Sequence, residues 1–384
     1  MGVPEEDFAE RSRSIFERLR AETSVDEDAD PPTSETVEPE LGTADGLDDQ
    51  PEDIAPAAPP DDAKPHDEAL PHDEALPHDD GGDADDTASD HQGVVGPEPE
   101  TLVASSPPEP EPEAESPLDP LRFVRPLPRV LAVANQKGGV GKTTTTVNLG
   151  ASLAVLGYRV LVVDLDPQGN ATTGLGINSR NLDSSIYDVI LHDVPLEDCV
   201  ESSQLRNLFV APATIDLAGA EIELVPAFSR ELRLRRALEQ VGEDYDFVLI
   251  DCPPSLGLLT VNALSAATEV IVPIQCEYYA LEGLGQLLRN VNLVQSNLNP
   301  KLELSAIILT MYDARTKLAE QVAVEVREHF GDKVCRNVVP RTVRLSEAPS
   351  FGQPIIVFDP SSRGALAYRE LAMEVSGGPP QRTG

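Results

Sequence analysis

The residues best suited to chemistry lie in the segment Asn135–Thr144, which reads Asn-Gln-Lys-Gly-Gly-Val-Gly-Lys-Thr-Thr. The segment follows an apolar, β-branched run, Val130–Ala134, and precedes a helical pattern, Thr145–Leu156. A Gly-rich turn between a strand and a helix N-terminus surrounds a phosphate with backbone N–H groups, and the helix dipole favours the negative charge. Lys142 is then placed to neutralise the β- and γ-phosphates, and Thr143 to offer its hydroxyl to Mg²⁺.

This loop departs from the usual phosphate-loop spacing, G-x-x-x-x-G-K-[ST]. Gln136 stands where the first glycine is expected, and a second lysine, Lys137, comes just before the glycines. The departure distinguishes the loop from an ordinary phosphate loop. The residues that we expect to contact the nucleotide phosphates are Lys137, Gly138, Gly139, Val140, Gly141, Lys142, Thr143 and Thr144.

Carboxylates follow two further apolar runs. In Val162–Gly169, Asp164 and Asp166 stand at positions i and i+2, so both side chains point the same way in an extended chain. The second run, Phe247–Ile250, is followed directly by Asp251. Because Mg²⁺ keeps much of its hydration and takes few protein carboxylates, Asp251 is suited to hold it through water.

Strand and helix patterns alternate over residues 129–375. The strand-like runs are nearly continuous in apolar residues, as expected for strands buried on both faces. These runs are Val130–Ala134, Val160–Asp164, Leu208–Ala211, Phe247–Ile250, Glu269–Pro273 and Leu304–Leu309. The helical stretches are 143–156, 214–224, 229–241, 256–266, 280–297 and 316–330. The order predicts an α/β fold with a doubly wound, mostly parallel sheet that binds ligands at the carboxyl ends of its strands.

The Gly-rich segment resembles the deviant Walker A box of the ParA/MinD ATPases, which are P-loop NTPases. Other segments resemble signatures of the chromosome-partitioning ParA (Soj-type) ATPases and occur in the same order. These segments are Val163–Thr172, Ile250–Ser255, Thr310–Thr316 and Pro340–Ser350. The resemblance covers the whole of residues 129–375.

The resemblance implies ATP and Mg²⁺ as cofactors and ATP hydrolysis as the reaction. It assigns Asp166 to positioning the attacking water and places Asp164 near the Mg²⁺ shell. In the family, the segments around Met311 and Pro340 flank the adenine. The metal ligands expected in this chain are therefore Thr143, Asp164 and Asp251, and the expected catalytic residues are Lys137, Lys142 and Asp166.

The resemblance also implies a working cycle. ATP promotes a sandwich homodimer in which Lys137 crosses to the opposite phosphates, where a cation stabilises charge that develops during phosphoryl transfer. The dimer binds DNA without sequence preference, and a ParB-type centromere-binding partner stimulates hydrolysis and release, which drives chromosome or origin segregation. Phosphate contacts require charge rather than a base-reading helix. The DNA contacts that we expect are Arg315, Arg341, Arg344 and Arg363, and two of these, Arg315 and Arg344, match positions that contact DNA in the family.

Related classes that share the loop provide alternatives. MinD-like membrane-positioning ATPases need a basic, amphipathic C-terminal helix, whereas residues 375–384 are rich in Gly and Pro. Nitrogenase iron proteins need cysteines that ligate a cluster between subunits, and Cys252 and the other three cysteines lack that pattern. A nucleotide-switched polar scaffold with little hydrolysis is a further alternative. Asp166 argues against the scaffold, and the long tail argues for it.

The acidity of the chain belongs to its N-terminal part. Residues 1–120 contain 37 Asp and Glu against 5 Lys and Arg, whereas the rest of the chain contains 30 against 24. Apolar residues in the tail are too sparse to offset the entropy cost of ordering it. We therefore expect a disordered, Pro-rich tail over residues 21–125, an ATPase domain over residues 126–376 and a flexible C-terminus over residues 377–384.

One segment of the tail differs from the rest. Within residues 1–20, Phe8, Ile15, Phe16 and Leu19 fall near one face of a helix. The segment is either a frayed peptide or a helix, over residues 4–20, that docks on a polar or cytoskeletal partner. We expect no transmembrane segment, because the sequence has no apolar run of 18 residues. The four scattered cysteines form no C-x-x-C pair, which favours a reduced, cytoplasmic protein, and the DNA binding that the resemblance implies would associate it with the nucleoid.

Removal of residues 1–120 should leave a folded chain that hydrolyses ATP, because every expected strand and nucleotide residue follows Arg129. Circular dichroism and phosphate release on the shortened and full-length chains would check this. A shortened chain that is insoluble, or that fails to bind ATP, would show that the tail packs on the domain.

Overall fold

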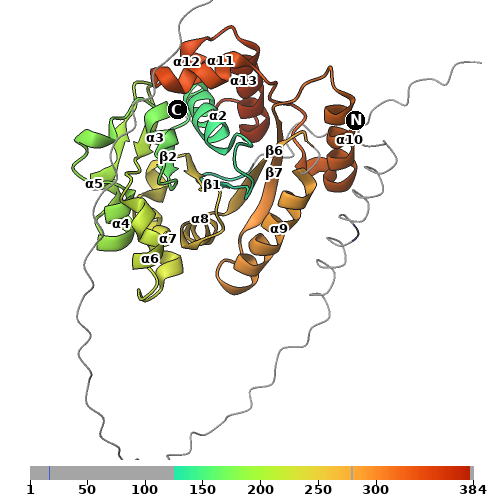
Figure 1. Ribbon diagram of the computed structural model, residues 1–384. Helices are drawn as coiled ribbons and strands as arrows, with labels where there is room; N and C mark the ends of the chain where they lie inside the picture. The colour runs from blue at the N-terminus through green and yellow to red at the C-terminus, as the bar shows by residue number, and fades with distance from the viewer. Residues whose placement is uncertain (1–16, 18–124, 278–279, 381–384) are drawn as a thin grey trace, which may run out of the picture. The chain divides into compact units, whose positions relative to one another are not determined.

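A computed structural model describes residue 17, residues 125–277 and residues 280–380 (Figure 1). The expected docking segment (apart from residue 17) and the acidic tail up to residue 124 lie outside the described residues. Among the described residues, no helix is long and apolar enough to cross a membrane.

The described residues form one seven-stranded sheet, in the order β3-β4-β2-β5-β1-β6-β7. Its strands are β1 (Arg129–Val133), β2 (Val160–Asp164), β3 (Glu201–Ser202), β4 (Leu208–Ala211), β5 (Phe247–Asp251), β6 (Glu269–Gln275) and β7 (Glu303–Thr310). All neighbouring strands pair in parallel except β3 and β4, which pair antiparallel. The expected doubly wound, mostly parallel sheet is confirmed.

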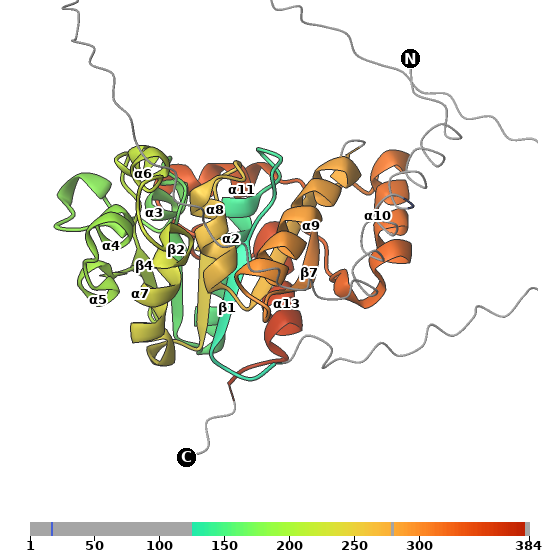
Figure 2. The same ribbon diagram turned by 90° about the horizontal axis from the view of Figure 1, so that it is seen from below.

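Helices cover both faces of the sheet (Figures 1 and 2). One face carries α2 (Lys142–Leu156), α3 (Asn170–Gly174), α11 (Val343–Glu347), α12 (Ile355–Phe358) and α13 (Arg363–Ser376). The other face carries α4 (Ile186–His192), α5 (Leu196–Cys199), α6 (Leu217–Glu223), α7 (Arg233–Val241), α8 (Leu258–Ala266), α9 (Ala280–Asn297) and α10 (Lys317–Phe330).

The two helix layers enclose two apolar cores that the strands separate. Along β1, Leu131 and Val133 belong to the core beneath α2 and α13, whereas Ala132 belongs to the core beneath α4–α10. This alternation follows from the two-residue period of a strand, so a strand buried on both faces must be apolar at every position. The strand-like runs of the sequence have this composition, and their expected bounds differ from the observed ones by at most two residues.

The sequence did not predict the short helices α3, α4, α5, α11 and α12, the strand β3 or the last helix, α13. The two-residue strand β3 is too short to produce a pattern. Helix α13 buries many small residues, including Gly364, Ala365 and Ala367, so its apolar period is weak. At Gly364 an added Cβ would lie 2.8 Å from Leu345 Cγ, which means that α13 packs closely on α11 only because this position lacks a side chain.

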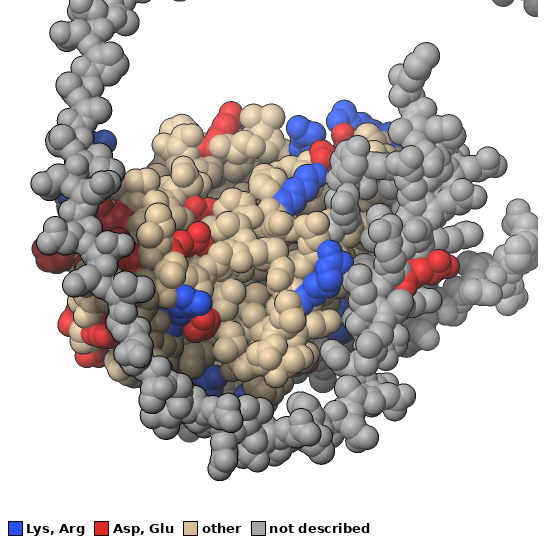
Figure 3. Space-filling view, turned by 60° about the horizontal axis from the view of Figure 1, so that its bottom comes forward, with Lys and Arg blue, Asp and Glu red and all other residues tan. Residues whose placement is uncertain are grey.

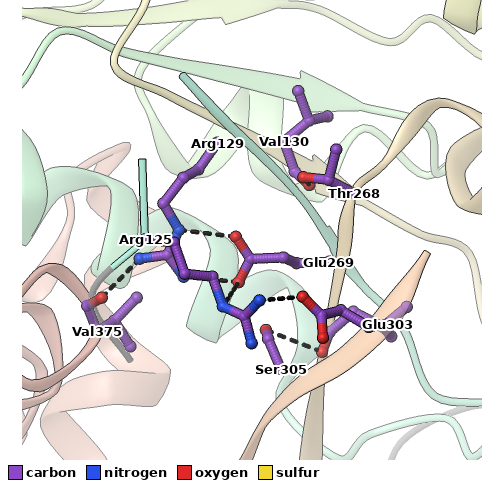
Figure 4. A network of polar contacts seen from close by, with 9 residues as sticks. Arg125, Arg129, Val130, Thr268, Glu269, Glu303, Ser305 and Val375 are labelled. Atoms are coloured by element: carbon purple, nitrogen blue, oxygen red, sulfur yellow. Dashed lines mark hydrogen bonds and ion pairs between the residues drawn. The ribbon is translucent and has the colours of Figure 1, made fainter. Parts of the chain in front are cut away.

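A buried ion pair closes the amino ends of the central strands (Figure 4). Arg129 at the start of β1 donates to both carboxylate oxygens of Glu269 on β6, at 2.7 and 2.6 Å, and to the Val375 carbonyl of α13 at 2.6 Å. Arg125 pairs with the same Glu269 and with Glu303 of β7. The paired groups satisfy one another away from water and join three strands to the last helix.

Arg129→Ala should lower the free energy of unfolding by about 3–5 kcal/mol, because it leaves the Glu269 carboxylate buried without its partner. Urea unfolding of both proteins would measure this. As a control, Arg235→Ala removes an exposed ion pair with Glu239 and should cost at most about 0.5 kcal/mol. Equal losses in the two variants would show that the buried pair contributes no more than a surface pair.

Candidate functional site

The Gly-rich loop joins β1 to α2 at the carboxyl edge of the sheet, opposite the edge near the C-terminal end (Figure 2). Gly139 and Gly141 have φ angles of 74° and 89°, a region that strongly favours glycine. Gly141 is the N-cap of α2 and carries no side-chain cap. The loop thus directs backbone N–H groups and the start of a 15-residue helix toward one anion position.

Lys142 lies inside this loop and is 6% exposed. Its Nζ donates to the Lys137 carbonyl at 3.3 Å. Burial lowers the pKa of Lys142, and attraction to Asp251 and Asp166 opposes that shift. A buried ammonium with one backbone partner is prepared to accept an anion such as a phosphate.

Two buried carboxylates face the first turns of α2. Asp164 of β2 and Asp251 of β5 are aligned residues of neighbouring parallel strands, and neither is exposed. Burial, together with the nearby charge of Asp164, raises the pKa of Asp251. Oδ1 of Asp251 accepts a hydrogen bond from the Thr146 hydroxyl at 3.0 Å, whereas its buried Oδ2 has no hydrogen-bond partner among the described residues.

The unpartnered oxygen makes Asp251 suited to a hydrated Mg²⁺. The Thr143 hydroxyl, at the start of α2, lies close enough to influence the pKa of Asp251. The described residues contain no cluster of three or more His, Cys, Asp or Glu side chains that could hold a metal by themselves. Mg²⁺ commonly binds through one or two protein groups together with substrate phosphates.

Asp164 holds the segment that follows it. Its Oδ1 accepts from the Asp166 backbone N–H at 3.2 Å, and its Oδ2 accepts from the backbone N–H and the hydroxyl of Thr172, at 2.8 and 2.7 Å. Asp166 in turn accepts from the Gln168 backbone N–H and remains 7% exposed. Oδ1 of Asp164 therefore helps to place Asp166, and Oδ2 anchors the start of α3 at Thr172.

Lys137 lies at the rim of the same edge, where its side chain is 32% exposed. Its backbone N–H donates to Asn135 Oδ1 at 3.0 Å, and Asn135 Nδ2 donates to the Pro273 carbonyl of β6. Its Nζ forms an ion pair with Glu277 at 3.2 Å. The two lysines of the loop thus have different surroundings, since Lys142 is enclosed and Lys137 is at the surface.

The two expected adenine neighbours lie on backbone segments that pair with each other. Tyr312 forms an isolated parallel bridge with Pro340, because the Tyr312 N–H donates to the Val339 carbonyl and the Arg341 N–H to the Tyr312 carbonyl. Met311, just before Tyr312, has φ 51°, which is a strained conformation for a residue with this side chain. Strain of this kind tends to persist where the surroundings enforce it, commonly at binding sites.

Three of the four arginines expected to bind DNA line one pocket of about 720 Å³. They are Arg315, Arg341 and Arg363. Arg344 is not among the lining residues, and its guanidinium pairs with Glu347 at 3.0 Å and Asp359 at 3.3 Å. Figure 3 shows one face of the molecule, on which basic side chains are separated by neutral surface. The positive charge there is local rather than a continuous field.

A family model described as an AAA domain matches residues 128–304. The sporulation initiation inhibitor protein Soj of Bacillus subtilis is 60% identical over 248 residues, which is 65% of this chain and 98% of that protein. The chromosome partitioning protein ParA of Myxococcus xanthus is 54% identical over 247 residues, 64% of this chain and 87% of that protein.

The chain belongs to the Soj/ParA family of chromosome-partitioning proteins.

Solved structures support the fold of this family member. A Mycobacterium smegmatis protein named as a cobyrinic acid a,c-diamide synthase, with bound ATP analogue and magnesium, is 45% identical at a TM-score of 0.57 and covers 64% of this chain and 93% of its own. The MinD protein of Pyrococcus horikoshii, complexed with Mg-ADP, is 28% identical at a TM-score of 0.53 and covers 64% and 95%.

The site of this Soj/ParA protein also contains residues that the sequence did not indicate. Thr146 and Thr172 hold the two buried carboxylates, and Thr310 donates to the Val140 carbonyl at 2.8 Å, which joins β7 to the Gly-rich loop. Glu277 holds Lys137. The sequence could have indicated Thr310 and Glu277, because both lie at or just after the carboxyl end of a strand, where sheets of this kind bind their ligands.

Asp251→Asn should stabilise the nucleotide-free chain at pH 8 and abolish Mg²⁺-dependent hydrolysis. The pKa of Asp251 is raised above its ordinary value of 3.8, so wild-type stability falls as pH rises from that value toward the raised pKa. Asn carries no charge and keeps the acceptor for Thr146. We expect Tm at pH 8 to rise by about 2–4 °C in calorimetry.

The same variant provides its own control at low pH. Well below pH 4, Asp251 is protonated in both the folded and the unfolded wild type, so the difference in Tm between the two proteins should shrink. A lower Tm for Asp251→Asn at pH 8 would contradict the assigned electrostatic cost.

Proposed function

We propose that this chain is an ATP-dependent DNA-partitioning ATPase. In its ATP-bound form it pairs as a sandwich dimer that binds DNA without sequence preference, and a ParB-type partner stimulates hydrolysis and release. The observation that carries the proposal is the buried Lys142 ammonium beside Asp251, whose second oxygen lacks a partner. The family's partitioning proteins and the nucleotide-bound solved structures support it.

Lys142 and the loop N–H groups bind the β- and γ-phosphates. Thr143 and Asp251 hold Mg²⁺, which neutralises phosphate charge when it is bound. Asp166 orients the attacking water, and Asp164 keeps Asp166 in place through the hydrogen bonds already described. In this role Asp164 acts through its neighbour rather than by direct contact with the triphosphate.

Lys137 serves the second subunit. It stands at the surface rather than inside the loop, so its ammonium is free to reach a partner once it leaves Glu277. A cation brought to the other subunit's phosphates stabilises charge that develops as the γ-phosphoryl leaves. Hydrolysis is thereby tied to pairing.

DNA binds at the pocket of Arg315, Arg341 and Arg363. Arg341 and Arg363 are exposed and form no ion pair among the described residues, whereas Arg315 forms a double hydrogen bond with Asp313. Cations without acidic partners are the ones most available to DNA phosphates. Arg344, with two acidic partners, is a weaker contact.

The names of the related proteins describe more than one activity. The M. smegmatis protein carries the name of a diamide synthase, and the Pyrococcus MinD protein is described as septum site-determining. Sequence identity favours partitioning as the function of this chain. The chain is 60% and 54% identical to the Soj and ParA proteins, but 45% and 28% identical to the two proteins of known structure.

Lys142→Ala should weaken ATP binding roughly a hundredfold, because a buried charge-assisted contact to phosphate costs about 3 kcal/mol to remove. Lys137→Ala should leave ATP affinity within about threefold of wild type and lose ATP-dependent dimerisation, since an exposed lysine contributes little in its own subunit. Calorimetric titration with an ATP analogue and sedimentation of the dimer would separate the two. Equal losses of affinity in both variants would refute this division of roles.

Arg341→Ala and Arg363→Ala should each weaken DNA binding uniformly across sequences and reduce the salt-dependence slope by about 0.9. Arg344→Ala is the matched comparison and should change the slope less, because two carboxylates already neutralise its charge. Fluorescence anisotropy with unrelated duplexes at several salt concentrations would measure the slopes. A larger change for Arg344→Ala than for the pocket arginines would place the DNA surface elsewhere.

A further inference from the structure

The ion pair between Lys137 and Glu277 joins two loops at the carboxyl edge of the sheet. Glu277 lies two residues beyond β6, and its carboxylate also accepts a hydrogen bond from the side-chain amide of Gln275, the last residue of that strand. On the other side, Asn135 fixes the Lys137 backbone to β6 through the Pro273 carbonyl. Both partners are therefore held by the same strand.

The first turn of α9 lies beside this pair. A Cβ added at Gly283 would lie 3.7 Å from Asn135 Oδ1 and 3.9 Å from Lys137 Cβ. The aliphatic stem of Lys137 is thus bordered by the helix on one side while its ammonium is drawn to Glu277. The described residues offer Lys137 one carboxylate partner, whereas Asp166 and Asp251 act on Lys142.

We propose that Glu277 is a latch within the subunit that holds Lys137 back and thereby opposes ATP-dependent pairing. The inference rests on the proposed role of Lys137 in the second subunit. One ammonium cannot remain 3.2 Å from Glu277 and also contact phosphates across an interface. Each subunit must break its own ion pair before its lysine crosses.

The strength of the latch follows from its exposure. The side chains of Lys137 and Glu277 are 32% and 48% exposed, so the pair belongs to the weak, solvent-screened class. Breaking one pair of this kind weakens subunit pairing by roughly threefold. Because a symmetric dimer breaks two such pairs, the dimer dissociation constant is raised by about tenfold. The latch therefore sets a threshold for pairing and does not block it.

A purely structural role for the pair makes a different prediction. If Glu277 only fastened α9 to the loop, its removal would lower stability and leave pairing unchanged. Because surface pairs contribute little to stability, the latch predicts an unchanged Tm together with tighter pairing. These two readouts separate the roles.

The test compares the full-length wild type, Glu277→Gln and the control Glu320→Gln. Glu320 is an exposed residue of α10 whose side chain forms no ion pair among the described residues. The control therefore changes the net charge of the chain by the same amount without breaking an ion pair. The first measurement, without nucleotide, is the rate of acetylation at Lys137 relative to the exposed Lys301, followed by mass spectrometry. The second is the dimer dissociation constant with a slowly hydrolysed ATP analogue, measured by sedimentation, and the Tm of each protein is measured by calorimetry.

In Glu277→Gln, Lys137 should be acetylated about threefold faster, because its amino group is no longer held in the ion pair, and the subunits should pair about tenfold more tightly. Glu320→Gln should match the wild type in both measurements. Unchanged pairing in Glu277→Gln, beside a wild type that does dimerise, overturns the latch alone. Failure of the wild type to dimerise with the analogue overturns the proposed dimer, whatever the acetylation shows.

Discussion

The structure depends on the placement of two buried carboxylates side by side. Asp164 and Asp251 end neighbouring strands in the same register, and neither side chain is exposed to solvent. Their repulsion is limited by hydrogen bonds from Thr146 and Thr172 and by the ammonium of Lys142. Burial of the two carboxylates is costly in the free protein, and a phosphate-bound cation held beside them would offset that cost.

Much of the fold follows from the sequence because its strands are apolar at every position, a composition that few other elements share. The strand register is what carries Asp164 to Asp251, and no local pattern specifies it. Helix α13 was not expected because its buried face consists largely of Ala and Gly. The sequence did not predict the positive φ of Met311, because that conformation is unusual for its side chain and accompanies the pairing of its neighbour, Tyr312, with Pro340.

The site residues also divide into those that the sequence indicated and those that only the structure revealed. The loop lysines and the three carboxylates were recognisable because each follows a strand and has a type that suits phosphate or Mg²⁺ chemistry. The partners that tune them were not recognisable, because the contact between Lys137 and Glu277 spans 140 residues of chain and that between Thr310 and Val140 spans 170. Sequence reasoning thus finds chemical groups more readily than the groups that hold them in place.

The ion pair between Arg129 and Glu269 has a mechanical consequence. Arg125, where the described part of the domain begins, lies next to the start of β1, so a force applied to the chain at that end acts first on the central strand. Strand β1 is bonded on both sides, to β5 and β6, so a force along its axis loads the hydrogen bonds of both edges together. The guanidinium of Arg129 fastens the same end of the strand to β6 and to the last helix, so the sheet resists shear at the point where the chain enters it.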